Sequence, residues 1–217
     1  YKWNNLVSVL MGDYLFATSA EMVSSTGNVR VMRLFAQTLM SISSGELGQV
    51  FSIYDWKQSR DHYYQRIASK TASLFAMATE SGAALSQAPE EAVQALRVYG
   101  HNLGICFQIA DDILDFVGDE AEMGKPVGSD LMQGTLTLPA ILLLEHYPND
   151  NPVKSLFENK GDRASLERAI DMVRNSKILP ECYTIAGEFC QRACQELDKL
   201  PTHPNVQALR DLSNFAI

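Results

Sequence analysis

The feature that most constrains the fold is a helical period that runs along almost the whole chain. Apolar residues recur at i, i+3, i+4 and i+7 in long stretches without proline, and period-two alternation bounded by turns is hard to find. This pattern predicts an all-α fold. We expect helices near residues 5–25, 28–51, 59–85, 89–116, 135–147, 151–159, 163–175, 178–199 and 204–215.

Turn residues separate these segments in a consistent way. Residues 25–28 (STGN) form a turn, Pro89 stands near the start of a helix, and Pro201 and Pro204 flank the last connection. No repeat, linker or low-complexity segment interrupts the pattern. With 217 residues, of which 46% are hydrophobic, the chain can bury one substantial core. We therefore predict a single all-α domain over residues 1–217.

One irregular segment, residues 117–134, is long for a connection between helices. It contains four glycines and one lysine, and it directly follows the most acidic part of a predicted helix. Long loops in compact helical domains are uncommon unless they have a function. We expect this segment to act as a lid or a ligand clamp.

Charge and cysteine content indicate which partners are excluded and which cellular compartment is favoured. With 26 acidic and 18 basic residues the net charge is −8, which argues against nucleic acid as a partner. The four cysteines form no CxxC pair, which favours buried thiols in a reducing environment. No apolar run reaches roughly 18 residues and the first residues lack a signal-peptide layout. We predict a cytoplasmic protein without an integral membrane segment.

The segment Phe107–Phe116 (FQIADDILDF) places three carboxylates in otherwise apolar surroundings. At about 100° per residue, Gln108, Asp111, Asp112 and Asp115 fall within an arc of roughly 100° on one helix face. The remaining surface of this helix is apolar. In a helical bundle this face is expected to line an interior cavity.

Three ionised carboxylates this close together repel one another. In a partly desolvated cavity one of them must take up a proton unless a cation compensates. Mg²⁺ suits the site better than Ca²⁺, because Mg²⁺ is often held by one or two carboxylates with waters and phosphate oxygens. The alternative is a solvated acidic face. We favour the metal site because Phe107 and Phe116 flank the acids and a glycine-rich loop follows them.

Three further residues, Lys70, Thr71 and Lys125, carry a charge or a hydroxyl at places that suit phosphate binding. Lys70 and Thr71 lie together in a helix whose next turns are small or apolar, and they could contact phosphate. A surface lysine is the alternative for Lys70. Lys125 could fold back over the end of the carboxylate helix, and an ordinary turn lysine is the alternative there. His101 is expected to be a core or rim residue, because no second His or Cys lies at ligand spacing.

Six short segments, in this order, resemble the trans-prenyltransferase family of isoprenyl diphosphate synthases. They are GDYLFA at 12–17, GELGQ at 45–49, KTASLF at 70–75, FQIADDILDF at 107–116, GDEAEMGKPVGSDL at 118–131 and GTLTLPAILL at 134–143. The resemblance is close over residues 1 to about 145 and looser beyond. A single DDxxD motif would be weak support, whereas the ordered set is specific.

The resemblance implies the isoprenoid synthase fold, an antiparallel helical bundle around a deep apolar cavity with two Asp-rich motifs at its mouth. Asp111, Asp112 and Asp115 match the second motif and would bind Mg²⁺, or Mn²⁺ in its place, with Asp111 touching the metal directly. The resemblance further implies that Lys70, Thr71 and Lys125 hold the allylic diphosphate, and that Phe107 and Gln108 lie beside a substrate. The catalytic residues implied in this way are Asp111, Asp112 and Lys70.

The activity implied by the resemblance is that of a magnesium-dependent polyprenyl diphosphate synthase that acts as a homodimer. Isopentenyl diphosphate would be condensed with an allylic diphosphate through an allylic carbocation. Two alternatives remain open: a non-catalytic or regulatory subunit with the same fold, and a class I terpene cyclase.

The sequence departs from the family pattern in two places. The first Asp-rich motif of the family, with the basic residues after it, lies upstream of the segment that matches Tyr1. We therefore expect a chain without its N-terminal helices, a fragment or a shortened relative, that does not form a complete active site. Thr135 stands where many members have lysine, which removes one expected phosphate contact.

Overall fold

The structure, a computed structural model, describes residues 4–118, 124 and 126–216. All regular secondary structure in these ranges is helical, as the sequence predicts. Lys125 lies outside the described residues. The elements are α1 (Asn5–Ser25), α2 (Val29–Phe51), α3 (Arg60–Ile67), a π-helix η1 (Ala68–Ala72), α4 (Ser73–Leu85), α5 (Glu90–Val117), α7 (Ser129–Met132), α8 (Leu138–His146), α9 (Pro152–Glu158), α10 (Arg163–Arg174), α11 (Ile178–Leu197) and α12 (Pro204–Phe215).

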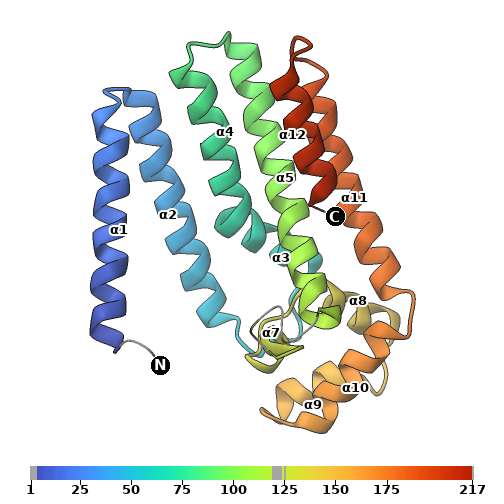
Figure 1. The fold of residues 1–217 in the computed structure, drawn as a ribbon. Helices are drawn as coiled ribbons and strands as arrows, with labels where there is room; N and C mark the ends of the chain where they lie inside the picture. The colour runs from blue at the N-terminus through green and yellow to red at the C-terminus, as the bar shows by residue number, and fades with distance from the viewer. Residues whose placement is uncertain (1–3, 119–123, 125, 217) are drawn as a thin grey trace.

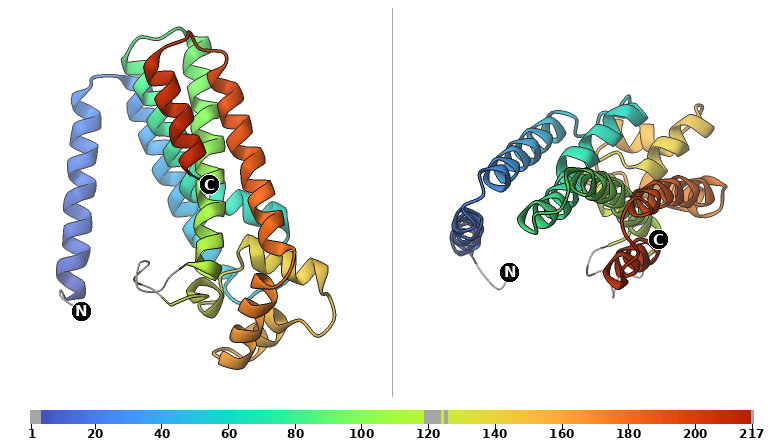
Figure 2. Two further views of the ribbon diagram at one scale, coloured as in Figure 1. Left: turned by 45° about the vertical axis from the view of Figure 1, so that its right-hand side comes forward. Right: turned by 90° about the horizontal axis from the view of Figure 1, so that it is seen from above.

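The long helices run side by side along the molecule, and the short ones gather at one end (Figure 1). α1, α2, α4, α5 and α11 follow one another as a curved row when seen from above, with α12 next to α5 and α11 (Figure 2). α5 is central, because it packs most extensively against α4 on one side and α11 on the other. The end of α5 that carries the aspartates lies next to α3, α7 and α8.

Local capping explains why several helices begin where the sequence predicts. The side chain of Asn28 accepts hydrogen bonds from the backbone N–H groups of Arg30 and Val31 at the start of α2. Ser59 accepts from the His62 N–H at the start of α3. Each oxygen satisfies donors that the first turn of a helix leaves unpaired.

The predicted helix over residues 59–85 is not continuous, which corrects the sequence prediction. The π-helix η1 divides it and carries Lys70 and Thr71. Close packing accompanies the π-helix: a Cβ atom added at Gly104 of α5 would lie 2.5 Å from the Ala72 Cα. The wider turn changes the direction in which Lys70 and Thr71 point relative to α3.

The segment predicted as an irregular loop contains the short helix α7, which the sequence reading missed. Gly128 precedes it with a φ of +72°, a conformation that glycine adopts without strain. The Gly128 N–H donates to the backbone oxygen of Asp115 at 2.7 Å. This contact ties the segment back onto the end of α5.

α1 is apolar around its circumference and none of its residues is buried. Its large exposed side chains include Leu6, Val9, Leu10, Met11, Tyr14, Leu15, Phe16 and Met22. By length and composition alone α1 is a candidate membrane span, which the sequence reading did not recognise. The same composition suits a helix that other protein surfaces cover on several sides.

Candidate functional site

A cavity of about 300 Å³ lies where the aspartates of α5 face the end of α2, the α3–η1 segment and the residues just before α8. We call it the carboxylate cavity. Its lining is mostly polar and consists of Gln49, Arg66, Ile67, Lys70, Gln108, Asp111, Asp112, Asp130, Gln133, Thr135 and Thr137.

The three aspartates of α5 lie in different environments. Asp111 is exposed and lines the cavity, whereas Asp112 and Asp115 are 4% and 0% exposed. Asp115 does not line the cavity: its carboxylate accepts from the Ser129 hydroxyl at 3.0 Å and from the Asp130 N–H at 3.2 Å. The prediction that all three share one cavity-facing surface is therefore wrong for Asp115, because the segment around α7 folds over it.

Asp112 is a buried carboxyl with a hydrogen-bond donor on each oxygen. The Tyr63 hydroxyl donates to Oδ2 at 2.7 Å, and Gln108 Nε2 donates to Oδ1 at 3.0 Å. Burial, which disfavours the charged form, raises the pKa of Asp112 to about 7 even though both hydrogen bonds and Arg66 act in the opposite direction. This agrees with the expectation that one of the clustered acids takes up a proton when no metal is bound.

Gln108 connects the predicted phosphate-binding and metal-binding residues. Its Oε1 accepts from the Thr71 hydroxyl at 2.6 Å. Its Nε2 donates to Asp111 Oδ2 at 3.2 Å as well as to Asp112. The structure therefore brings Thr71, Gln108, Asp111 and Asp112 together, and their roles toward a ligand remain predictions.

Lys70 and Phe107 border this network. Lys70 lines the cavity, is half exposed, and its Nζ lies 2.5 Å from Glu46 Oε1 of α2. Phe107 is 47% exposed, and its ring packs against that of Phe75 with centroids 5.4 Å apart. Lys70 thus lines the same cavity as Asp111, and Phe107 lies one helical turn before Asp111 on α5. Lys125 lies outside the described residues, so its predicted contact with the diphosphate stays a prediction.

Sequence reasoning missed two buried residues of α3 that support the cavity. Tyr63 is fully buried and holds Asp112. Arg66 is 8% exposed and donates through Nη2 to the Leu136 oxygen at 2.5 Å. Burial lowers its pKa, while Asp112 and Asp130 act in the opposite direction. The i, i+3 spacing along α3 could have identified both residues as members of one helix face.

The donor set of the cavity suits a magnesium ion held by few protein ligands. Within the described ranges, no three His, Cys, Asp or Glu side chains form a ready metal cluster. Asp111 and Asp130 both line the cavity, together with the side-chain amides of Gln49 and Gln133. Mg²⁺ binds oxygen and often takes only one or two carboxylates, with waters and substrate phosphates completing its shell. The residues present fit that description.

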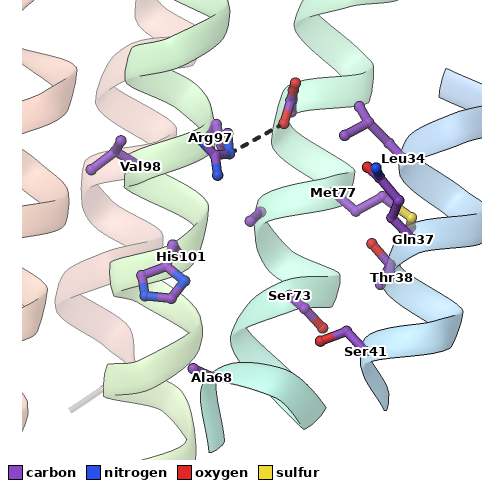
Figure 3. A pocket seen from close by; sticks show the side chains of 12 residues that line it. Leu34, Gln37, Thr38, Ser41, Ala68, Ser73, Met77, Arg97, Val98 and His101 are labelled. Atoms are coloured by element: carbon purple, nitrogen blue, oxygen red, sulfur yellow. Dashed lines mark ion pairs between the residues drawn. The ribbon is translucent and has the colours of Figure 1, made fainter. Parts of the chain in front are cut away.

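A second cavity, of about 410 Å³, lies between α2, α4 and α5 (Figure 3). Its charged groups already have partners, because Glu80 pairs with Arg97 at 3.5 Å and with Arg30 at 2.8 Å. His101 faces this cavity, and burial together with Arg97 lowers its pKa. His101 is thus a rim residue, as predicted, and the carboxylate cavity is the better candidate for chemistry.

Comparison with known proteins gives one family. A family model described as polyprenyl synthetase matches residues 1–173. The heptaprenyl diphosphate synthase component 2 of Geobacillus stearothermophilus is 37% identical to this chain, over 99% of this chain and 67% of its own length. Across the first curated relatives the chain spans between 50% and 67% of their length.

Solved structures agree on the fold. The heptaprenyl diphosphate synthase from Staphylococcus aureus has a TM-score of 0.95 and 32% identity, covering 99% of this chain and 68% of its own. A polyprenyl synthase from Caulobacter crescentus, complexed with calcium and isoprenyl diphosphate, has a TM-score of 0.92 and 32% identity. The match covers 99% of this chain and 66% of the Caulobacter chain. The all-helical architecture predicted from the sequence is therefore confirmed.

Proposed function

The chain belongs to the polyprenyl synthetase family, and on that basis we propose that the intact protein is a magnesium-dependent polyprenyl diphosphate synthase. It would join isopentenyl diphosphate to an allylic diphosphate and release a longer prenyl diphosphate. The named relatives, among them heptaprenyl and solanesyl diphosphate synthases, support this class of reaction. The predicted cytoplasmic location remains a prediction.

The observation that carries the proposal is the position of Asp111. Its carboxylate is exposed to the cavity, while its neighbour Asp112 is buried and accepts one hydrogen bond on each oxygen. Gln108 holds both carboxylates in place and also accepts from Thr71. An open carboxylate beside fixed hydrogen-bonding groups is what binding of a metal-bound diphosphate requires.

Bound Mg²⁺, or Mn²⁺ with the same ligands, would supply positive charge that neutralises the departing diphosphate. The Caulobacter structure, with calcium and isoprenyl diphosphate, supports a divalent cation in this family. In this chain Asp111 would hold the cation, with Asp130 near it, and Lys70 would orient the diphosphate. Lys70 now pairs with Glu46 and would exchange that partner for a phosphate oxygen.

The apolar surface beside Asp111 fits a prenyl chain. Phe107 and Leu114 of α5 are each about half exposed, at 47% and 48%, and Leu74 of α4 is 43% exposed. Phe75 packs on Phe107 and extends the same surface. Such a surface would bind an isoprenyl chain and keep water away from a carbocation.

We further propose that a second protein chain covers α1 and α2, as in the homodimer expected from the sequence. The support is the apolar, unburied surface of α1. The name "component 2" of two relatives favours a different companion chain as the alternative. The mass of the intact assembly, measured by light scattering, would distinguish two identical chains from two different ones.

A product assay on the intact protein tests the proposal. With Mg²⁺, isotope-labelled isopentenyl diphosphate and an allylic diphosphate, we expect label in longer prenyl diphosphates. Release of a hydrocarbon or alcohol would show a terpene cyclase instead. Product that forms only after addition of a companion chain would show a two-component enzyme, and full activity of that mixture with Asp111→Ala in this chain would show that this chain is a non-catalytic subunit.

A further inference from the structure

A buried hydroxyl without a hydrogen-bond partner lines the carboxylate cavity. Thr137 is 2% exposed, and within the part of the chain that the structure describes its Oγ1 has no partner. Buried polar groups are nearly always paired, because leaving one unpaired costs stability. An exception on the wall of a candidate site calls for a functional explanation.

The helix that begins at Thr137 does not use this hydroxyl. Thr137 is the N-cap of α8, where a threonine side chain usually accepts from a first-turn N–H, but here it makes no such bond. Only its backbone oxygen takes part, accepting from Ile141 at 3.0 Å. The hydroxyl therefore remains available on the cavity side.

Arg66 meets the same wall from α3. Its guanidinium donates to the oxygen of Leu136, the residue directly before Thr137, and it lines the cavity. A guanidinium has five N–H donors, and the bonds to Leu136 and Gln58 occupy two of them. A buried cation, an unpaired hydroxyl and the N-terminus of a nine-residue helix therefore converge at one place.

These groups share a preference for an anionic oxygen. Helix N-termini and guanidinium groups both bind phosphate, and a hydroxyl can donate to it. Asp111, Asp112 and Asp130 line the same cavity and would repel an anion, so a diphosphate there needs donors as well as a metal. Arg66 and Thr137 are donors of this kind.

We propose that Arg66 and Thr137 form a diphosphate-oxygen subsite on the wall of the cavity formed by α3 and the start of α8. The subsite would take an oxygen of the diphosphate whose metal is held at Asp111. This proposal rests on the proposed function and adds two contacts that the sequence motifs did not indicate. It also explains why a destabilising unpaired hydroxyl is present.

The test compares Thr137→Val with Thr137→Ser in the intact protein. Binding of inorganic diphosphate in the presence of Mg²⁺ is measured by calorimetry, and thermal unfolding is measured without ligand. We expect Thr137→Val to weaken binding roughly tenfold or more, because a hydrogen bond to a charged group is lost. Thr137→Ser keeps the hydroxyl and should stay within about threefold of wild type.

Unfolding gives a readout that a structural role would not produce. Thr137→Val should raise the unfolding temperature, because a methyl group replaces an unpaired buried hydroxyl of similar shape. Ser81 is the matched control, since its buried Oγ also lacks a partner among the described residues but does not line the carboxylate cavity. Ser81→Ala should raise the unfolding temperature and leave diphosphate binding unchanged.

Arg66→Lys tests the second contact. Lysine keeps the charge but loses the planar fork, so we expect binding to weaken roughly tenfold. Arg66 also donates a hydrogen bond to the Leu136 oxygen, so the binding constant of Arg66→Lys is compared with wild type only if the two proteins have similar unfolding temperatures. The comparison of Thr137→Val with Thr137→Ser decides the proposal in either case.

Two results would separate this proposal from the proposed function. If Thr137→Val binds diphosphate as well as wild type, or unfolds at a lower temperature than wild type, the subsite is overturned. The proposed function still stands in that case, provided that Asp111→Asn abolishes binding. If wild-type protein fails to bind diphosphate with Mg²⁺, or Asp111→Asn binds it normally, the proposed function fails and the subsite fails with it.

Discussion

The side chains around the carboxylate cavity and those on α1 differ in how far other residues of this chain cover them. Around the cavity, Asp112 and Arg66 are buried and hydrogen-bonded to partners from distant parts of the sequence. On α1, by contrast, Leu10 and Tyr14 are 57% and 68% exposed although they are apolar or aromatic. The cavity wall is set by contacts within the chain, whereas the apolar surface of α1 is left uncovered by this chain.

Substitutions in the two regions should therefore have different effects. A change at the cavity should alter ligand binding, or the pH dependence of folding, in the chain itself. A change on α1 should alter what the protein assembles with.

The largest expected effect is on the cavity side. Asp111→Ala should lower turnover of the intact protein by about a thousandfold, because the open metal ligand is lost. The free energy of unfolding should change by no more than about 0.5 kcal/mol, because Asp111 is exposed. Asp211→Ala, at an exposed aspartate of α12, is the control and should retain full turnover. Comparable turnover in both variants would argue against the cavity as the site of chemistry.

The second prediction concerns the pH dependence of stability in metal-free protein. Asp112 has a pKa of about 7 when folded, above its ordinary 3.8, so the folded state binds its proton more tightly than the unfolded state. The free energy of unfolding should therefore fall as pH rises from about 4 to 7 and then level off. The gap between the two pKa values corresponds to an upper bound of roughly 4 kcal/mol.

Asp112→Asn removes the ionisable group and should flatten this part of the profile. Urea unfolding at several pH values, with a chelator present, provides the measurement. An unchanged profile in the Asn variant would mean that another group carries the dependence.

The third prediction moves to α1. Leu10→Lys together with Tyr14→Lys should weaken self-association or binding of a companion chain by at least about a hundredfold, or 2.7 kcal/mol, since each side chain loses burial. Gln191→Lys with Gln195→Lys, at exposed positions of α11 with the same spacing, is the matched control. Sedimentation velocity measures the assembly. Equal assembly in both double variants would show that α1 is not the covered surface.

The fourth prediction returns to the cavity. Tyr63→Phe should lower the free energy of unfolding by about 1–3 kcal/mol at pH 8, because the buried carboxylate of Asp112 loses a donor. At pH 5.5, where Asp112 is protonated, the loss should be smaller. Tyr183→Phe, at an exposed tyrosine of α11, should have no measurable effect at either pH. A penalty independent of pH would mean that Tyr63 acts through packing alone.

The smallest expected effect is at Glu46. Its ion pair with Lys70 involves two side chains that are each nearly half exposed, so it contributes little free energy. Glu46→Gln should free Lys70 and tighten diphosphate binding by about two- to fivefold. Weaker binding in this variant would show that Glu46 positions Lys70 instead of competing for it.

Most helix positions could be predicted because the signals that set them are local. The apolar period and the capping residues Asn28 and Ser59 lie within a few residues of the boundaries they define. The π-helix η1 could not be predicted in this way. It occurs where Ala72 of η1 and Gly104 of α5 approach closely, a contact between segments far apart in the sequence.

The candidate site shows the same limit. Helix geometry correctly groups Gln108, Asp111 and Asp112, because their direction depends only on spacing along α5. It fails for Asp115, which is covered by Ser129 and the Asp130 backbone from a later segment. Which carboxylate stays open is decided by tertiary contacts that no periodicity records.

The role of Asp111 as a metal ligand is tested most directly by locating the bound ion. Crystals of the intact protein would be soaked with Mn²⁺ and inorganic diphosphate, and an anomalous difference map would be calculated. We predict an Mn²⁺ peak in the carboxylate cavity within coordination distance of Asp111, at about 2.0–2.3 Å, with diphosphate bound to the metal. A peak only at other acidic residues, or diphosphate bound away from Asp111, would show that Asp111 does not hold the metal.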